Sequence, residues 1–529
     1  MSQNPKAVDE RAQLNADDRG VVAGGDISGT VLTGDIQGDV AVGRNIIQIG
    51  NLNMPLIPVL LVIALVAALG VGAYWWFAVP SKMSGGFKVA VAQVGRVDAN
   101  GNAQASDDGS KLSQFVFESL KSEFDSLAAN SQIAQDFRPT IWHDSMNLFQ
   151  KKTTIGMIPR DPALQAQALK ELARRIDADV IIFGSLEANQ NQGSFTPEFY
   201  VAGLRFEADE LIGDHQLGAP IIIPLPINLD STGSRLNLSR NVTVRSYALS
   251  RFTFGLLYDL FGDHAKAYKT FQDAEPGLTD WDEDQGKEIL YYFIGREAIS
   301  LGTDEKEAKR VFKSVDEALQ KAQAAFEKAQ QINKDYARAH IGLGNVYYLR
   351  AQRGLVADKI DTPEFITATS EAGFALDQFT QAVKGSQQPA DAAVNLKAQL
   401  SVGSAYRLQG HALVLRAAFS ESLPFFEKAV KALEQALPRV EPSQLRLLGQ
   451  TNQVLGAAYH EEAHALYAQD ALAQSKPFYE KARDYYKQCS EVASKGVAVY
   501  DVTLQNLKKN ACDPSLKAVN DVLKELEGK

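Results

Sequence analysis

The longest uninterrupted run of apolar residues lies near the N-terminus, from Pro55 to Val79. It contains no charged residue, and aromatic residues gather at its C-terminal end. As a helix its 25 residues would rise about 37 Å, enough to cross a hydrocarbon core of ~30 Å. Aromatic rings at one end are typical of the headgroup level of a membrane. The pattern therefore predicts one transmembrane helix over residues 55–79, in contact with a lipid bilayer.

A repeating pattern of glycines and β-branched residues precedes this run. Within residues 25–50, glycines alternate with β-branched residues in steps of four and five, which together give a period of nine. Such alternation predicts a small β-solenoid of short strands over residues 21–53. Three short coils bury too little surface to be stable alone, so we expect this segment to form a homo-oligomer or to dock onto another protein. Residues 1–20 are polar, and we expect them to be disordered.

After the apolar run, the pattern alternates between short strands and amphipathic helices. This alternation predicts a small α/β domain over residues 86–230. The expected elements are a strand at 87–94, helices at 111–127 and 161–176, a buried strand at 179–186, and further apolar runs at 198–204 and 219–227.

From about residue 240 the helical period dominates. An aromatic residue followed three positions later by alanine recurs five times, at intervals of 47 to 55 residues. Glycine followed three positions later by tyrosine recurs between these sites, although the copy around Gly295 lacks the tyrosine. We interpret these recurrences as about five helix pairs that stack into a right-handed solenoid over residues 240–510. A capping helix is expected at residues 511–529.

The first of these units is similar to a tetratricopeptide repeat. Its small and aromatic residues stand at relative positions 8, 11, 15, 20, 24 and 27, as that family requires; they are Gly255, Tyr258, Gly262, Ala267, Phe271 and Ala274. The resemblance implies antiparallel helices that approach at small residues, with aromatic rings filling the gap between them. It also implies a concave surface for binding proteins or peptides.

If the groove positions of the tetratricopeptide family carry over, four polar residues project into this concave surface. They are Arg338, Asn345, Lys397 and Arg407. Cations and an amide in one groove could hold a carboxylate or an acidic peptide. The alternative interpretation is an ordinary solvated helix face, and the long intervals between the repeats leave the register open.

The α/β segment has a resemblance of its own. The order of a KVAVAQ strand, a helix near KLSQFVFESL, a helix ending in ELARRIDAD and a strand VIIFGSLE is similar to the TolB N-terminal-like and FlgO-like domains of bacterial envelope proteins. The similarity covers roughly 110 residues. It implies a binding and assembly module without catalytic residues, on the far side of a membrane span and ahead of helical repeats.

Composition and charge narrow the range of functions. The chain has 529 residues, of which 45% are hydrophobic, and a net charge of −10. An acidic balance argues against a general nucleic-acid binder, which needs a basic face. Cys489 and Cys512 are the only cysteines, so one bridge is possible but no four-thiolate metal site. Whether they are bridged is left open.

Two arguments about membrane orientation oppose each other. Near the apolar run, Arg44 stands on the N-terminal side and Lys82, Lys88 and Arg96 on the C-terminal side. By the positive-inside rule this favours a cytoplasmic C-terminus. The envelope-protein resemblance favours the opposite orientation. We therefore expect a single-pass protein of a bacterial inner membrane with extracytoplasmic C-terminal domains.

One enzyme signature occurs in the sequence. His460, Glu461 and His464 form an HEEAH segment, in which two imidazoles one helical turn apart could bind zinc while the glutamate activates water. A zinc hydrolase would also need a third ligand and a substrate strand beside this helix. Because the segment lies inside a repeat helix, we expect a solvated helix face, and no cofactor or catalytic residue is assigned.

The sequence as a whole predicts a multidomain protein with a Gly-rich β-repeat, one transmembrane helix, an α/β domain and a tetratricopeptide-type solenoid. We expect a non-enzymatic scaffold or adaptor that binds proteins or peptides through its repeats and clusters through its N-terminal segment. One alternative is a membrane sensor that couples ligand binding to oligomerisation. The other is the zinc hydrolase.

Overall fold

The computed structural model divides into two units, Met1–Ala78 and Val79–Lys529, and the described part is mostly helical with a small sheet region. In the first unit, β1 (Ile46–Ile49) and β2 (Leu52–Pro55) pair in antiparallel fashion at the end of the predicted β-repeat. The structure describes residues 46–49, 52–55, 82–130, 139–144, 154–189, 191–203, 211–229, 232–276, 284, 286–356, 359–360, 362–388, 391–498 and 502–527.

None of the helices in these ranges is both long and apolar enough to cross a membrane. The predicted transmembrane helix, residues 55–79, lies outside the described residues except for Pro55, the last residue of β2. The predicted tail at 1–20 and most of the β-repeat at 21–53 lie outside them as well.

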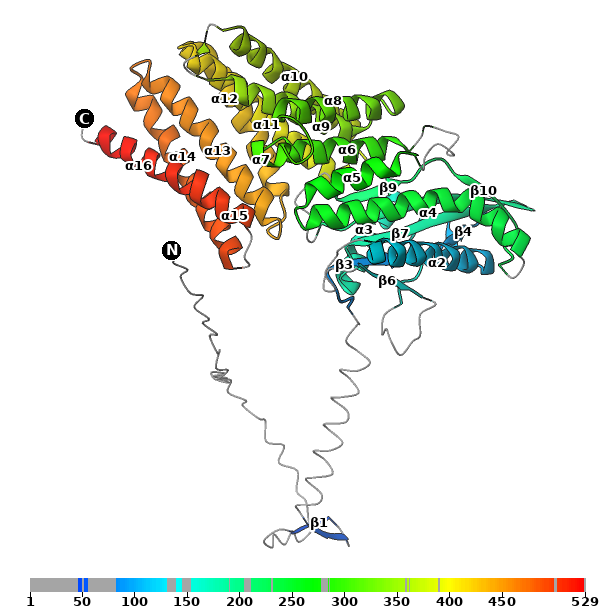
Figure 1. Ribbon diagram of the computed structural model, residues 1–529. Coiled ribbons are helices and arrows are strands. Elements are labelled where there is room, and N and C mark those ends of the chain that lie inside the picture. The colour runs from blue at the N-terminus through cyan, green and yellow to red at the C-terminus, as the bar shows by residue number, and fades with distance from the viewer. Residues whose placement is uncertain are drawn as a thin grey trace, which may run out of the picture. The chain divides into compact units, whose positions relative to one another are not determined.

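A mixed sheet forms the first part of the larger unit (Figure 1). Its main path runs in the order β10-β8-β7-β3-β6; β3 pairs with β6 and β7 in parallel, and β8 is antiparallel to β7, β9 and β10. This sheet bears out the expected strands at 87–94 and 179–186 with small shifts of their ends. The strands are β3 (Phe87–Val91), β4 (Gly95–Val97), β5 (Ala103–Gln104), β6 (Pro139–His143), β7 (Val180–Ala188), β8 (Gln192–Val201), β9 (Gly213–Gln216) and β10 (Ile221–Pro224).

Helices cover both faces of this sheet. Alternate side chains of a strand point to opposite faces, so one strand supplies two cores. On β3, Val89 and Val91 belong to the core that contains α2 (Asp107–Asn130) and α4 (Thr232–Leu260), whereas Ala90 belongs to the core under α3 (Pro162–Ile176). Because α4 is also the first repeat helix, the sheet and the helical part share a continuous core.

Pairs of antiparallel helices follow the sheet, and each pair packs against the next. The turn of the first pair contains Gly262, whose φ of 71° lies in the left-handed region that glycine adopts without steric cost. The pairs in the described residues are α4 with α5 (His264–Ala274), α6 (Glu288–Leu301) with α8 (Val315–Ile332), α9 (Ala337–Gly354) with α10 (Pro363–Gly385), α11 (Ala392–Leu415) with α12 (Phe419–Ala436), and α13 (Leu445–Tyr467) with α14 (Leu472–Ala498); α7 (Glu305–Ala308) and a 3₁₀ turn (Leu437–Arg439) lie in connections.

Glycine and aromatic side chains set the spacing of the first three pairs. A Cβ atom added to Gly255 would lie 2.2 Å from the ring of Phe271. The corresponding distance is 2.7 Å from Gly295 to Phe326 and 2.4 Å from Gly344 to Phe379. These contacts agree with the expected packing, and they include the Gly295 unit, which lacks the tyrosine.

The last two pairs have a different register. Gly410, and not Gly403, lies against Phe426, while Gly456 lies against Tyr486 and not against Tyr479. Both differences are seven residues, or about two helical turns. The glycine and tyrosine repeat thus identifies the first helix of each of these pairs but not the contact that joins it to the second.

The C-terminal end of the stack is closed by two further helices. α15 (Val502–Leu507) continues through a π-helical turn (Lys508–Cys512) into α16 (Asp513–Glu527), the expected capping helix, which packs on α14. Cys489 on α14 and Cys512 are joined by a disulfide, with 5.7 Å between their Cα atoms. Both cysteines are fully buried, so this bridge holds the cap to the last helix pair.

Candidate functional site

A groove of about 290 Å³ lies on the helical repeats. The first helices of three successive pairs, α9, α11 and α13, supply most of its lining. Tyr348 and Val454, which are partly exposed, provide aromatic and aliphatic surface there. Ligand and peptide sites combine apolar surface with polar groups that fix the orientation of the ligand.

Four of the polar side chains that line the same groove carry an amide or an ammonium group. Asn345 lies on α9, Lys397 on α11, and Gln450 and Gln453 lie on α13. Within the described residues, none of these side chains makes a hydrogen bond or an ion pair. The groove thus offers amide groups and one ammonium group that the fold itself does not use.

Asn345 and Lys397, two of the four residues predicted for the concave surface, therefore lie together in this groove. Arg338, by contrast, is buried: its guanidinium donates to the carbonyl oxygen of Ile212 at 3.2 Å and lies 3.7 Å from Asp391. This arginine joins the sheet part to the repeats and does not line the groove. Arg407 is largely buried next to Tyr348, one of the groove residues.

Arg407 instead pairs with a residue of the HEEAH segment. Its Nη1 lies 2.6 Å from Oε1 of Glu461, and Nδ1 of His411 lies 3.4 Å from the same oxygen. Burial opposes ionisation of Glu461, but Arg407 and His411 outweigh it and hold the pKa of Glu461 below its usual value. A carboxylate paired with a guanidinium in this way is a poor general base for activating water.

The two histidines of that segment contact aromatic rings. The imidazole of His460 lies 5.7 Å from the ring of Tyr479, and burial lowers its pKa, while the exposed His464 lies 6.2 Å from the ring of Phe419. In the described ranges, neither histidine belongs to a group of three metal-ligating side chains.

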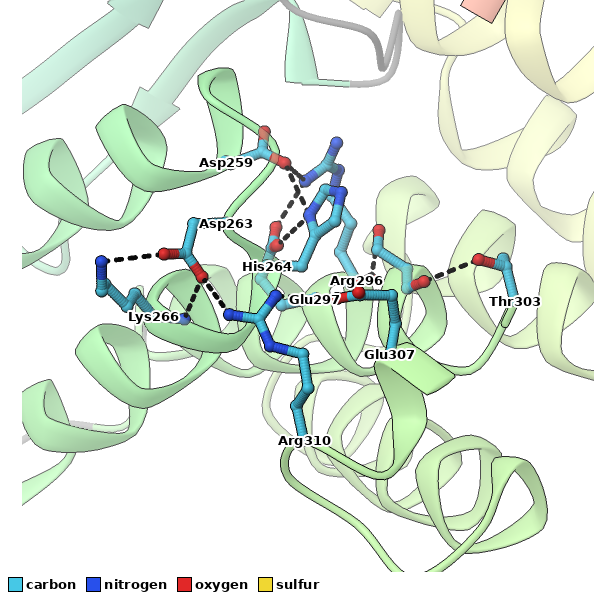
Figure 2. Close-up of polar contacts among 10 residues, drawn as sticks. Asp259, Asp263, His264, Lys266, Arg296, Glu297, Thr303, Glu307 and Arg310 are labelled. Carbon is cyan, nitrogen blue, oxygen red and sulfur yellow. Dashed lines mark hydrogen bonds and ion pairs between the residues drawn. The ribbon is translucent and has the colours of Figure 1, made fainter. Parts of the chain in front are cut away.

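Among the described residues, Asp259, His264 and Glu297 form a group of three side chains of metal-ligating types, where α4, α5 and α6 meet (Figure 2). His264 Nδ1 lies 2.9 Å from Glu297 Oε2 and 3.3 Å from Asp259 Oδ1. Arg296 Nη1 lies 2.8 Å from Asp259 and also pairs with Glu297. Two cations therefore face two carboxylates in a largely buried, charge-balanced network.

The pKa values in this network follow from burial and from these pairs. Burial alone would lower the pKa of His264, but hydrogen bonds and charges from Asp259 and Glu297 raise it to about 10. Burial and the Asp259 charge raise the pKa of Glu297, while Arg296 and His264 outweigh burial and lower the pKa of Asp259. With an arginine between its carboxylates, the network joins helix pairs and is not a vacant ligand set.

Sequence reasoning missed the two glutamines of the groove. A positional signal exists for Gln450: it stands six residues before Gly456, as Lys397 stands six before Gly403 and Arg338 six before Gly344. Reading that offset once more along the chain would have identified it. Gln453, one turn further on α13, follows from the same helix face.

Comparison with known proteins adds no assignment to this geometry: profiles of known protein families give no match to the chain, and no curated protein matches its sequence.

Proposed function

We propose that the protein is a non-enzymatic scaffold that binds an acidic peptide segment of a partner protein in the groove on α9, α11 and α13. The single observation that carries this proposal is the convergence of Asn345, Lys397 and the two glutamines on one partly apolar groove, where none of them has a partner in the part of the chain that the structure describes. Polar groups left unpaired at a concave surface are available to a ligand at no cost to the fold.

The chemistry of these groups fits an extended peptide. Primary amides both donate and accept hydrogen bonds, and so they match the alternating N–H and C=O groups of a peptide backbone. The ammonium of Lys397 supplies three donors for a carboxylate. Tyr348 and Val454 offer surface for apolar side chains between the acidic ones.

Sequence and packing support the proposed repeat type, membrane span, N-terminal assembly and compartment. The glycine and aromatic contacts of the first three helix pairs support a tetratricopeptide-type solenoid. The uncharged run at 55–79 supports a single membrane span, and the strand pair β1–β2 beside it supports a role of residues 21–53 in assembling copies. A disulfide is typical of an oxidising compartment, so Cys489 and Cys512 support extracytoplasmic C-terminal domains at a bacterial inner membrane.

Peptide binding tests the proposal directly. The full chain in detergent is titrated into fluorescein-labelled octapeptides that carry Asp or Glu at alternate positions, and anisotropy is recorded. We expect the acidic pool to bind and Lys397→Ala to weaken binding about tenfold, because a charge-assisted hydrogen bond is worth ~1.5–3 kcal/mol.

A matched control is Lys384→Ala, which removes an exposed lysine on α10 outside the groove and leaves binding unchanged. The proposal fails if a pool with Lys in place of the acidic residues binds equally well. It also fails if Lys397→Ala binds the acidic pool like the unmodified chain.

A further inference from the structure

A second and larger cavity, about 570 Å³, lies between the sheet part and the repeats. One wall comes from α3 and from the strands β8 and β9, and the other from the start of α11 and the segment around Glu441. Small apolar residues such as Ala166, Ala173 and Ala392 line it beside Ile212 and Leu396. Its volume falls in the ~300–1,000 Å³ range of small-molecule sites, which occur preferentially at domain interfaces.

Tyr200 supplies an unused polar group in this cleft. The residue is only 6% exposed, but its hydroxyl oxygen is not fully buried and makes no hydrogen bond within the described residues. A hydroxyl that faces a cavity and has no partner among the described residues is available as donor and acceptor to a ligand group. Burial, and then the charge of Asp214, raises the pKa of Tyr200 to about 12. The charge of Glu441 also raises this pKa, and that of Arg174 lowers it.

Asp214 is the anionic group of the cleft wall. It lies opposite Tyr200 in the register of β8 and β9 and accepts a hydrogen bond from Gln165 at 3.1 Å. Burial is the main cause that raises the pKa of Asp214 above its usual value. This carboxylate is partly buried, and Arg338 is the cation that acts on it. A ligand ammonium group would add to that compensation, because an opposite charge favours the ionised form.

A pair of cations lies at the rim of the same cleft. Lys170 and Arg174 stand one turn apart on α3, and both pair with Glu441 from the repeat part, Arg174 at 3.3 Å. All three side chains are about half exposed, which makes this ion pair easy to exchange. The carboxylate of Glu441 thus occupies the position that a ligand carboxylate would take.

We propose that this cleft binds a short zwitterionic ligand with apolar side chains, a free amino acid or a peptide of two or three residues. Its ammonium group contacts Asp214 and the Tyr200 hydroxyl, and its carboxylate replaces Glu441 on Lys170 and Arg174. The apolar side chains lie against the alanines, Ile212 and Leu396. Because Glu441 belongs to the repeats and Lys170 to α3, binding releases one contact between the two parts.

Calorimetry on the full chain in detergent tests this site. The ligands are leucine, leucyl-leucine and leucyl-leucyl-leucine, which separate an amino acid from a peptide, and N-acetyl-leucyl-leucinamide, which lacks both charges. We expect at least one free-ended ligand to bind and the blocked one not to bind. Tyr200→Phe, which removes only the hydroxyl, weakens binding about tenfold.

Glu441→Gln sharpens the test because it removes the competing carboxylate, so we expect it to strengthen binding several-fold. Tyr247→Phe is the matched control: it removes a phenol hydroxyl on α4, outside the cleft, and leaves binding unchanged. The proposal is overturned if no free-ended ligand binds at millimolar concentration, if the blocked peptide binds equally well, or if Tyr200→Phe binds like the unmodified chain.

Discussion

His264 shows how a single residue can stabilise the junction between helix pairs. It is the first residue of α5 and reaches two carboxylates, Asp259 on α4 and Glu297 on α6. Arg296 supplies the second cation, so removing any one member leaves a buried charge uncompensated. The network ties three helices together at the point where the sheet part passes into the repeats.

This network predicts a pH dependence of stability. The pKa of His264 is raised to about 10 in the folded chain, against ~6.5 in an unfolded one. Its contribution is therefore complete below pH ~6.5 and is lost as the pH rises toward 10. We expect His264→Gln to lower the free energy of unfolding by ~1–3 kcal/mol at pH 6 and by much less at pH 10, as measured by urea unfolding. A difference that does not change with pH would contradict this assignment.

The helix pairs are held at close range by glycines that face aromatic rings. Gly344 on α9 meets Phe379 on α10. Gly373 on α10 has open space beside it: apart from its own helix backbone, the atom nearest to an added Cβ would be Gln409 Nε2, at 3.8 Å. Both glycines lie inside helices, where alanine is intrinsically preferred. They therefore separate the effect of packing from that of helix propensity.

These two positions give opposite expectations for the same substitution. Gly344→Ala forces a methyl group against the Phe379 ring and should destabilise the chain by ~1–3 kcal/mol. Gly373→Ala should stabilise it by up to ~1 kcal/mol. Thermal unfolding of the two variants beside the unmodified chain measures both effects, and stabilisation by both substitutions would refute the packing argument.

The fold was more predictable from sequence than the sites were. The Gly255 and Phe271 contact follows from local spacing, because both residues lie within one short helix pair. The register of the last two pairs does not, since Gly403 and Gly410 stand seven residues apart on nearly the same face of α11 and either could meet the aromatic ring. The cleft depends on Lys170 meeting Glu441, 271 residues away, and no local pattern encodes that distance.

On the scale of the whole molecule, the proposal includes a membrane span at 55–79, which would leave the helical part on one side of a membrane. The buried disulfide between Cys489 and Cys512 is relevant to the side of the membrane on which the helical part lies, as well as to its stability. A bridge of this kind persists in an oxidising compartment and is rare in the cytosol. It therefore favours the orientation implied by the envelope-protein resemblance over the one implied by the positive-inside rule.

Protease treatment of intact spheroplasts measures the orientation. We expect residues 83–529 to be digested from outside, and a maleimide to label Cys489 and Cys512 only after reduction and unfolding. Digestion that requires lysis, together with labelling of unreduced protein, would assign the groove and its partner to the cytoplasm.

The two ends of the helical stack are unlike its middle. At one end α4 shares its core with the sheet, and at the other the Cys489–Cys512 bridge fastens the cap to α14. Each interior pair contacts mainly its neighbours, as in other solenoids. A pair inserted between these ends ahead of Glu441 would also shift Glu441 away from Lys170 and Arg174, so the number of pairs there is fixed by the sheet part as well as by the two terminal contacts.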